Sequence, residues 1–315
     1  MREVIFEVGD SVKALLTSLG GRDIFVVPVG SVMKETNIAG SDMDFSVKFA
    51  LGVGLGKCAG IFRNHKPPRV FHINGCTFEF KSCHFEFKKS MYILALKLEY
   101  NQGLVQFTCD VDVVEQPVFS SLQNTFFVRH YTVHFSGVAK LMQSIKSLAS
   151  NQNINDSKTQ TLIGFGWELL TIIALVQLGK LPAVDPTFFD VNRQIYETMS
   201  YCDISGFDYY VAILADDEQT RSFEDAPAQF SELEVLRRIS EILTDREDGR
   251  QLVIKFRNAD IQPEAPSAHL VIVDPCVPRG SLGNNVARAV DKSGLARIRL
   301  GLQIIIKELS KNYPY

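Results

Sequence analysis

The chain lacks any apolar run that approaches the ~20 residues of a membrane-spanning helix. Its N-terminal region is not acid-poor, because Glu3, Glu7 and Asp10 come early. This argues against a secretory signal peptide and against an Arg-rich transit peptide. The net charge is only −3 at pH 7. These absences predict an intracellular protein with no membrane partner, and they leave the choice between cytoplasm and mitochondrion open.

Cysteine is also scarce, and its spacing has no rhythm of a disulfide framework. The six cysteines are scattered over the chain: Cys58, Cys76, Cys83, Cys109, Cys202 and Cys276. Paired cysteines are typical of oxidising compartments, whereas isolated ones are typical of reducing compartments. We therefore expect free thiols.

What the chain does have is enough apolar residue content for a large core. It has 315 residues, of which 46% are hydrophobic and 22% charged, which favours one large or two ordinary globular domains. A helical pattern over residues 3–19 precedes a strand-rich region, and from Ser120 the apolar period becomes helical. The expected strands are 24–29, 43–49, 70–73, 77–80, 92–98 and 105–114. The later apolar helical stretches are 133–148, 162–178, 230–243 and 293–309.

This order predicts an α+β fold with two domains. Residues 1–125 would form a catalytic domain with a mixed sheet and helices, and residues 126–315 a mostly helical domain, with a cleft between them. The charge distribution is uneven, because residues 201–250 carry thirteen acids against five basic residues, whereas residues 251–315 carry five against nine. A basic channel opposite an acidic face is one interpretation, and ordinary surface variation is the other.

The most informative motif joins a Gly-Ser pair to an Asp-x-Asp step. Gly30 and Ser31 follow an apolar strand, and after a nine-residue spacer, 32–40, the residues Ser41, Asp42 and Asp44 lead into the next strand. Residues i and i+2 of a strand share a face, so both carboxylates project to one side. Like charges this close repel each other unless cations lie between them, and Mg²⁺ prefers carboxylate oxygens. The glycine lets the backbone approach a phosphate, whose oxygens the serine can bind.

A third carboxylate is expected from a neighbouring strand, since two-ion nucleotidyl transfer uses one more metal ligand. The run from Phe107 to Val114 offers Asp110 and Asp112, which share one strand face. Two acids on a face that is otherwise buried are costly unless a metal or hydrogen bonds compensate. The bland interpretation, a solvated strand edge beside a turn, explains either half of the pattern but not their combination.

Together these motifs resemble the template-independent terminal nucleotidyltransferases of the DNA polymerase beta-like superfamily, which include terminal uridylyltransferases and cytoplasmic poly(A) polymerases. The resemblance covers nearly the whole chain. It implies two Mg²⁺ or Mn²⁺ ions on Asp42, Asp44 and Asp112, and transfer of a nucleotide from a triphosphate to the 3′ end of single-stranded RNA with release of pyrophosphate. The spacing to Asn124 favours Asp112 over Asp110, at twelve residues rather than fourteen.

The resemblance also implies a set of nucleotide-binding residues. Asn124 and Thr125 match the family's ribose-reading pair, Lys146 matches its triphosphate-binding lysine, and Phe165 matches a ring that stacks on the base. Ser150 and Gly164 stand where family members usually carry a basic residue and a hydroxyl. The full implied set is Gly30, Ser31, Asn124, Thr125, Lys146, Ser150, Gly164, Phe165, Asp274, Asn284 and Arg288.

The resemblance implies that UTP is the substrate, with Asp274 accepting a hydrogen bond from the uracil N3–H, directly or through water. Some uridylyltransferases carry a histidine where this chain has Asn284, which leaves ATP and poly(A) addition open. A 2′-5′ oligoadenylate synthetase-like enzyme, suggested by the stretch from Glu168 to Ile172, and an inactive scaffold that binds RNA or protein also stay open. A larger RNA-processing complex is a further possible partner. The low net charge predicts few phosphate contacts with RNA.

Overall fold

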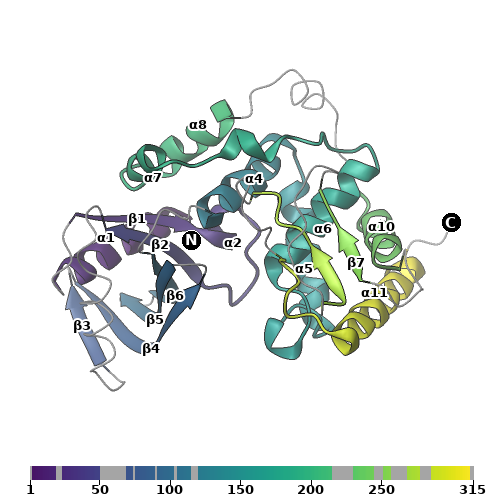
Figure 1. Ribbon diagram of the computed structural model, residues 1–315, viewed down its shortest axis with the longest axis horizontal. Helices are drawn as coiled ribbons and strands as arrows, with labels where there is room; N and C mark the ends of the chain where they lie inside the picture. The colour runs from purple at the N-terminus through teal and green to yellow at the C-terminus, as the bar shows by residue number, and fades with distance from the viewer. Residues whose placement is uncertain are drawn as a thin grey trace. The chain divides into compact units, whose positions relative to one another are not determined.

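A computed structural model describes residues 2–18, 23–49, 69–73, 75–88, 91–102, 105–114, 120–214, 230–244, 251–256, 268–276 and 285–312 (Figure 1). The chain divides into two compact units. Unit 1 comprises residues 1–126 and 191–211, and unit 2 comprises residues 127–190 and 212–315. A segment of about twenty residues thus returns to the first unit. The assignment of catalysis to residues 1–125 and nucleotide recognition to residues 126–315 stays a prediction.

Unit 1 is built on a six-stranded mixed sheet, which confirms the predicted α+β class. The strands lie in the order β1-β2-β6-β5-β4-β3. The pair β2 and β6 is parallel, and the other neighbours are antiparallel. The strand bounds are β1 Ile24–Val29, β2 Met43–Phe49, β3 Arg69–Ile73, β4 Cys76–Lys88, β5 Met91–Gln102 and β6 Val105–Val114. Apolar alternation predicted β1, β2 and β6 to the residue, whereas β4 and β5 extend further than predicted.

Helix α1 (Arg2–Ser18) packs on one face of this sheet and decides which side chains the other face presents. Its apolar stripe is fully buried and consists of Ile5, Val8, Val12, Leu15 and Leu16. A Cβ on Gly9 would lie 3.3 Å from the Phe45 ring, so the glycine lets α1 approach β2 closely. Since Phe45 faces α1, its neighbour Asp44 points to the opposite face. On the segment that returns to unit 1, α7 (Arg193–Met199) contacts β1 and α8 (Ile204–Leu214) follows it.

Unit 2 is mainly helical, with a small sheet. The helices α5 (Val138–Asn151), α6 (Gly164–Gln177), α10 (Glu232–Thr244) and α11 (Lys292–Asn312) pack on one another, and Figure 1 shows α10 and α11 side by side. Strands β7 (Leu252–Ile254) and β8 (Leu270–Ile272) form a parallel pair that the sequence did not predict. Within the expected apolar stretch 133–148 the chain turns at Gly137, whose φ is +88°, so α4 (Ser120–His134) ends before α5 begins.

None of the helices in the described part of the chain combines the length and the apolar character that crossing a membrane demands. Cys76, Cys109, Cys202 and Cys276 are free thiols, while Cys58 and the side chain of Cys83 lie outside the described residues.

The core of unit 2 contains a histidine among aromatic rings. His130 on α4 has none of its side chain exposed. Its ring centroid lies 5.5 Å from those of Tyr131 and Phe189 and 4.6 Å from that of His134. Burial, and secondarily His134, lower the pKa of His130 to about 3. His130 therefore serves core packing, with the half-buried His134 beside it.

This depressed pKa predicts an acid-labile core. The pKa of His130 is about 3 in the folded protein, and its ordinary value is 6.5. As the pH falls from about 6.5 towards 3, the imidazole is therefore protonated in the unfolded chain but stays neutral in the folded protein. Stability is then lost at up to ~1.4 kcal/mol per pH unit. We expect His130→Leu to flatten the dependence of the unfolding free energy on pH between 5 and 7.5, measured by urea denaturation. The exposed His269, replaced by Gln, is the control, and parallel curves for wild type and His130→Leu would refute the prediction.

Candidate active site

The acidic residues predicted from the sequence come together on the face of the sheet opposite α1. On the parallel strands β2 and β6, Asp44 is the register partner of Asp110, and Ser46 is the partner of Asp112. Asp42 lies directly before β2. Register partners and residues two apart share a face, so all four carboxylates lie on one side. Asp110 is the neighbour of Asp44, whereas the exposed Asp112 lies one register step further along.

The register therefore favours Asp110 over Asp112 as the third member of the acidic cluster, which we define as Asp42, Asp44 and Asp110. The preference for Asp112 came from the spacing to Asn124, and that spacing spans residues 115–119, which lie outside the described residues.

The Gly30–Ser31 turn lies against Asp44. Gly30 begins α2 (Gly30–Met33) and has a φ of +76°. A Cβ placed on it would come within 2.0 Å of the Asp44 Oδ2 atom. Its backbone N–H donates to the Thr125 Oγ1 atom at 3.1 Å, and that hydroxyl in turn donates to the Ser121 carbonyl. Thr125 is fully buried and holds the turn in place through this hydrogen bond, and its contact with the nucleotide sugar stays a prediction. Ser31 is partly exposed beside it.

The electrostatics of Asp44 show that the cluster is under-compensated. Burial raises the pKa of Asp44 to about 7, and the charge of Asp110 adds to this, with smaller contributions from Asp42 and Asp112. Lys34, which is buried at the end of the turn, acts in the opposite direction. The sequence pattern did not single out Lys34, although it lies within the spacer of the motif.

Lys97 on β5 is a second cation that the sequence pattern did not reveal. Its Nζ atom lies 3.1 Å from Asp42 Oδ2 and 3.4 Å from Asp110 Oδ1. The sequence did contain a clue to Lys97, since a lysine between Leu96 and Leu98 is unusual in an apolar strand. In the structure this strand pairs with β6, and Lys97 lies directly opposite Asp110. Its ammonium group lies between two acids of the cluster and partly neutralises them.

The acidic cluster fits a divalent hard cation in its donor chemistry. Carboxylate oxygens are the ligands that Mg²⁺ and Mn²⁺ prefer, and the raised pKa of Asp44 marks a place where positive charge would be stabilised. Among the described residues, no three His, Cys, Asp or Glu side chains converge closely enough to hold an ion as they stand. The Lys97 ammonium lies between two of these acids, Asp42 and Asp110.

Gly30 and Gly40 provide a matched pair for testing the turn. Both have positive φ values, +76° and +79°, but a Cβ on Gly40 meets nothing within 4 Å. Each Gly→Ala change incurs the strain of the left-handed backbone, about 1 kcal/mol, while Gly30→Ala also displaces the Asp44 carboxylate. For the RNA nucleotidyl transfer that the sequence resemblance implies, we expect Gly30→Ala to reduce turnover at least ~100-fold and Gly40→Ala to leave it within a few-fold of wild type, measured as RNA extension. Equal losses in both variants would contradict this view of the turn.

Four of the predicted nucleotide-binding residues lie on α5 and α6 of unit 2. Lys146 does not offer its charge to solvent, because its Nζ atom lies 2.9 Å from Glu168 Oε1 and the two side chains are 5% and 2% exposed. Ser150, one turn further along α5, accepts a hydrogen bond from Asn155 Nδ2 at 3.0 Å. Gly164 and Phe165 form the first turn of α6, and Phe165 is partly exposed. Phe165 is therefore not a plain core residue.

Three further predicted residues, Asp274, Asn284 and Arg288, follow β8 in the sequence. Asp274 is buried, and its Oδ1 atom accepts from the Cys276 N–H at 3.0 Å. Arg288 is exposed. Asn284, the residue on which base choice was predicted to depend, lies outside the described residues. The sequence pattern did not reveal the role of its neighbour Asn285, which links this segment to β8. The Asn285 amide donates to the Leu270 carbonyl and accepts from the N–H groups of Ile272 and Ala287.

The remaining predicted residue, Asn124, lies on α4 in unit 1, one position before Thr125, and is partly buried. The structure thus places Gly30, Ser31, Asn124 and the acids in unit 1, and the α5, α6 and β8 residues in unit 2.

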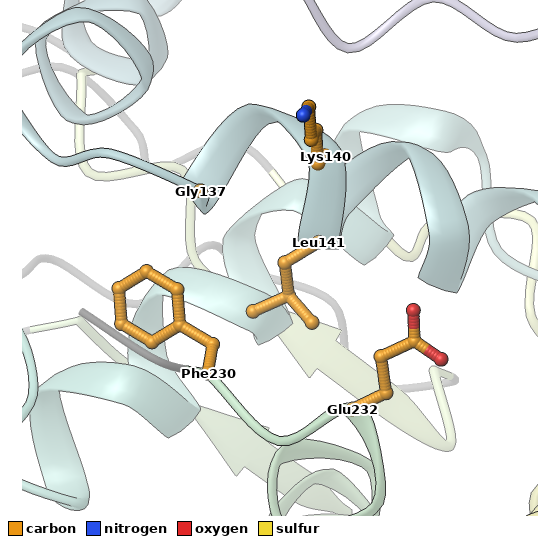
Figure 2. A pocket seen from close by; sticks show the side chains of 5 residues that line it. All are labelled: Gly137, Lys140, Leu141, Phe230 and Glu232. Carbon is orange, nitrogen blue, oxygen red and sulfur yellow. The ribbon is translucent and has the colours of Figure 1, made fainter.

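A hollow of about 240 Å³ in unit 2 is lined by residues of α5 and of the start of α10: Gly137, Lys140, Leu141, Phe230 and Glu232. Figure 2 shows Leu141 pointing between Phe230 and Glu232, while Lys140 points away from them. The hollow contains none of the predicted site residues, and its polar groups do not converge on one point. We therefore do not assign it to the candidate active site.

Comparison with known proteins gives a consistent result for the fold. No protein-family model and no curated protein sequence matches the chain. Solved structures of Cid1 poly(U) polymerase do match it: the MgGTP-bound form has a TM-score of 0.61 at 19% identity, over 99% of this chain and 91% of that chain.

Cid1 in complex with its short product ApU has a TM-score of 0.59 at 19% identity, over 98% of this chain and 88% of that chain. A cytoplasmic RNA terminal U-transferase has a TM-score of 0.58 at 18% identity, over 98% and 87%. The chain shares the fold of these proteins over almost its full length.

Proposed function

We propose that the chain is a template-independent nucleotidyltransferase of the terminal transferase family, which adds UMP from UTP to the 3′-hydroxyl of single-stranded RNA and releases pyrophosphate. The observation that carries the proposal is the pairing of Asp44 with Asp110 on parallel strands, beside a Gly-Ser turn that contacts Asp44. The likeness to Cid1 and to an RNA terminal U-transferase supports the same reaction class.

The acidic cluster would hold the divalent ions, as Mg²⁺ or Mn²⁺, since its carboxylates supply hard oxygen ligands on one face. Bound there, two such ions would lower the pKa of the attacking 3′-hydroxyl and stabilise the charge on the triphosphate and the leaving oxygen. Magnesium accompanies the nucleotide in the matching Cid1 structures with MgGTP and with Mg 3′-dATP.

The protein's own groups position the substrates. The Gly30 turn, held by Thr125, keeps its backbone close to Asp44, and the Ser31 hydroxyl can bind a phosphate oxygen next to it. Asn124 would bind the ribose hydroxyl, and the partly exposed Phe165 would stack on the base. Asp274 would accept from the uracil N3–H through the carboxylate oxygen not used by Cys276. Asn284 and Arg288 would complete base selection.

The choice of base is the finer part of the proposal. Cid1 structures contain MgGTP, Mg 3′-dATP and a UTP analogue, so the shared fold accommodates purines as well as uracil. ATP is therefore the second candidate substrate. We propose an intracellular site of action, and recruitment to a larger RNA-processing complex stays a prediction from the sequence.

The test is extension of a labelled single-stranded RNA with Mg²⁺ and each of the four nucleoside triphosphates in separate reactions, with Asp42→Ala as the inactive control. Extension with UTP well above the other three supports the proposal as stated. Preference for ATP would retain the reaction class and replace the base assignment. No extension with any triphosphate, or extension that persists in Asp42→Ala, would refute the proposal and favour a scaffold.

A further inference from the structure

The buried ion pair of unit 2 joins the predicted triphosphate-binding lysine to an acid on the next helix. Lys146 is on α5 and Glu168 is on the second turn of α6, and their Nζ and Oε1 atoms are 2.9 Å apart. Both side chains are at least 95% buried. In this state the ammonium group is neutralised, and a phosphate would have to compete with Glu168 for it.

The first residue of α6 leaves room for this arrangement. A Cβ on Gly164 would lie 3.1 Å from Lys146 Cε and 3.3 Å from its Nζ. The Lys146 ammonium therefore lies beside the first turn of α6. The positive end of the helix dipole lies there and disfavours the positive charge of the lysine. Glu168 offsets both this repulsion and the loss of hydration of the ammonium group.

Two residues near this pair, Ser150 and Phe165, carry no positive charge that could replace that of Lys146. Ser150 lies one turn from Lys146 on the same side of α5 and carries no charge, and its hydroxyl is bonded to Asn155. The partly exposed Phe165 lies in the same first turn of α6 as Gly164. The Lys146 ammonium group thus lies beside the turn that carries the predicted base-stacking ring, and its charge is neutralised by Glu168.

We propose that Glu168 is a positioning residue that holds Lys146 in the nucleotide-free protein and competes with the triphosphate for it. Binding of a triphosphate then exchanges the Lys146–Glu168 pair for a Lys146–phosphate pair. Its several negative charges make a triphosphate a better competitor than a single carboxylate. This role rests on the proposed function, and it makes triphosphate affinity weaker than an unpaired lysine would allow.

The first test measures binding of inorganic tripolyphosphate by calorimetry to wild type, Glu168→Gln, Lys146→Met and the double variant. We expect Glu168→Gln to bind about tenfold more tightly than wild type, and the same change to have no effect in the Lys146→Met background. Glu241→Gln is the matched control, because it removes an exposed acid paired with Arg238 in the same unit. Unchanged or weaker binding by Glu168→Gln, or an equal gain in both backgrounds, would overturn the proposal.

The second test is read in wild type, and a variant is needed only to assign the signal. A buried, paired ammonium group gives a protected ¹H–¹⁵N lysine side-chain signal, which Lys146→Met identifies by its loss. We expect saturating tripolyphosphate to shift this signal. Bound tripolyphosphate with an unshifted signal would overturn the role of Glu168 and leave the proposed function standing. Failure of wild type to bind tripolyphosphate or any nucleoside triphosphate, together with no RNA extension, would overturn both.

Discussion

Asp44→Asn is expected to abolish nucleotide addition, by ~10³-fold or more, and at the same time to stabilise the protein in the absence of metal. The loss of activity follows from the proposed function, in which Asp44 would be a metal ligand and supply several kcal/mol of charge stabilisation in the transition state. The gain in stability follows because the loss of hydration at the partly buried Asp44 carboxyl and the charge of the neighbouring Asp110 raise its pKa to about 7. An amide of the same shape removes the repulsion.

The gain in stability has a defined pH dependence. The folded pKa of Asp44 is about 7 and the ordinary value 3.8, so folding favours the protonated acid, and wild type loses stability as the pH rises from about 4 through about 7. Asn does not titrate, and the difference in Tm between Asp44→Asn and wild type should therefore grow from pH 5 to pH 8. We expect a difference of about 2–4 °C at pH 8 for each kcal/mol of relieved repulsion.

Added metal should have the opposite effect, because it should stabilise wild type more than Asp44→Asn. Mg²⁺ or Mn²⁺ should raise the Tm of wild type, because a ligand that binds only the folded state stabilises it, and should raise that of Asp44→Asn much less. Asp10→Asn, an exposed acid on α1, is the control and should behave as wild type throughout. A metal-free Asp44→Asn that is less stable than wild type at pH 8 would contradict the charge argument.

The second large effect separates two acids on the same strand. Asp110→Asn is expected to reduce RNA extension ~10³-fold or more, whereas Asp112→Asn is expected to retain activity within about tenfold. The reason is register, since Asp110 is the partner of Asp44 while Asp112 is the partner of Ser46. The two substitutions are chemically identical and two residues apart, so each serves as the control of the other.

Steady-state kinetics and metal binding followed by Mn²⁺ titration would check this pair. A turnover rate that collapses in Asp112→Asn and survives in Asp110→Asn would restore the assignment made from the spacing to Asn124. Loss in both variants would show that two acids of β6 serve the site together.

Local pattern was sufficient for much of unit 1. Strands β1, β2 and β6 were predictable because their side chains alternate or run continuously apolar between turn signals, and the Asp-x-Asp step on such a strand requires a shared face for Asp42 and Asp44. The parts of unit 2 with short elements were not predictable in this way. The strands β7 and β8 have three residues each, which is too few for a period to show.

Two side chains, Lys97 and Glu168, were not predicted from the sequence for a different reason. Lys97 lies 55 positions from Asp42, and Glu168 lies 22 positions from Lys146. No spacing rule connects such pairs, because their proximity depends on strand order in one case and on helix packing in the other. The hydrogen bond from the Gly30 N–H to the Thr125 hydroxyl is of the same kind, since it joins residues 95 positions apart.

The sequence by itself determined the α+β class, the motif that joins Gly30 and Ser31 to Asp42 and Asp44, and the presence of further acids on a later strand. Each of these depends on periodicity or on residues close in the chain, for which backbone geometry sets the direction of side chains. Only the tertiary structure decided that Asp110 lies beside Asp44, that Lys97 bridges two acids and that Glu168 neutralises Lys146. Those charges meet through register and packing between distant segments, which are set by the burial of whole apolar faces and not by any local pattern.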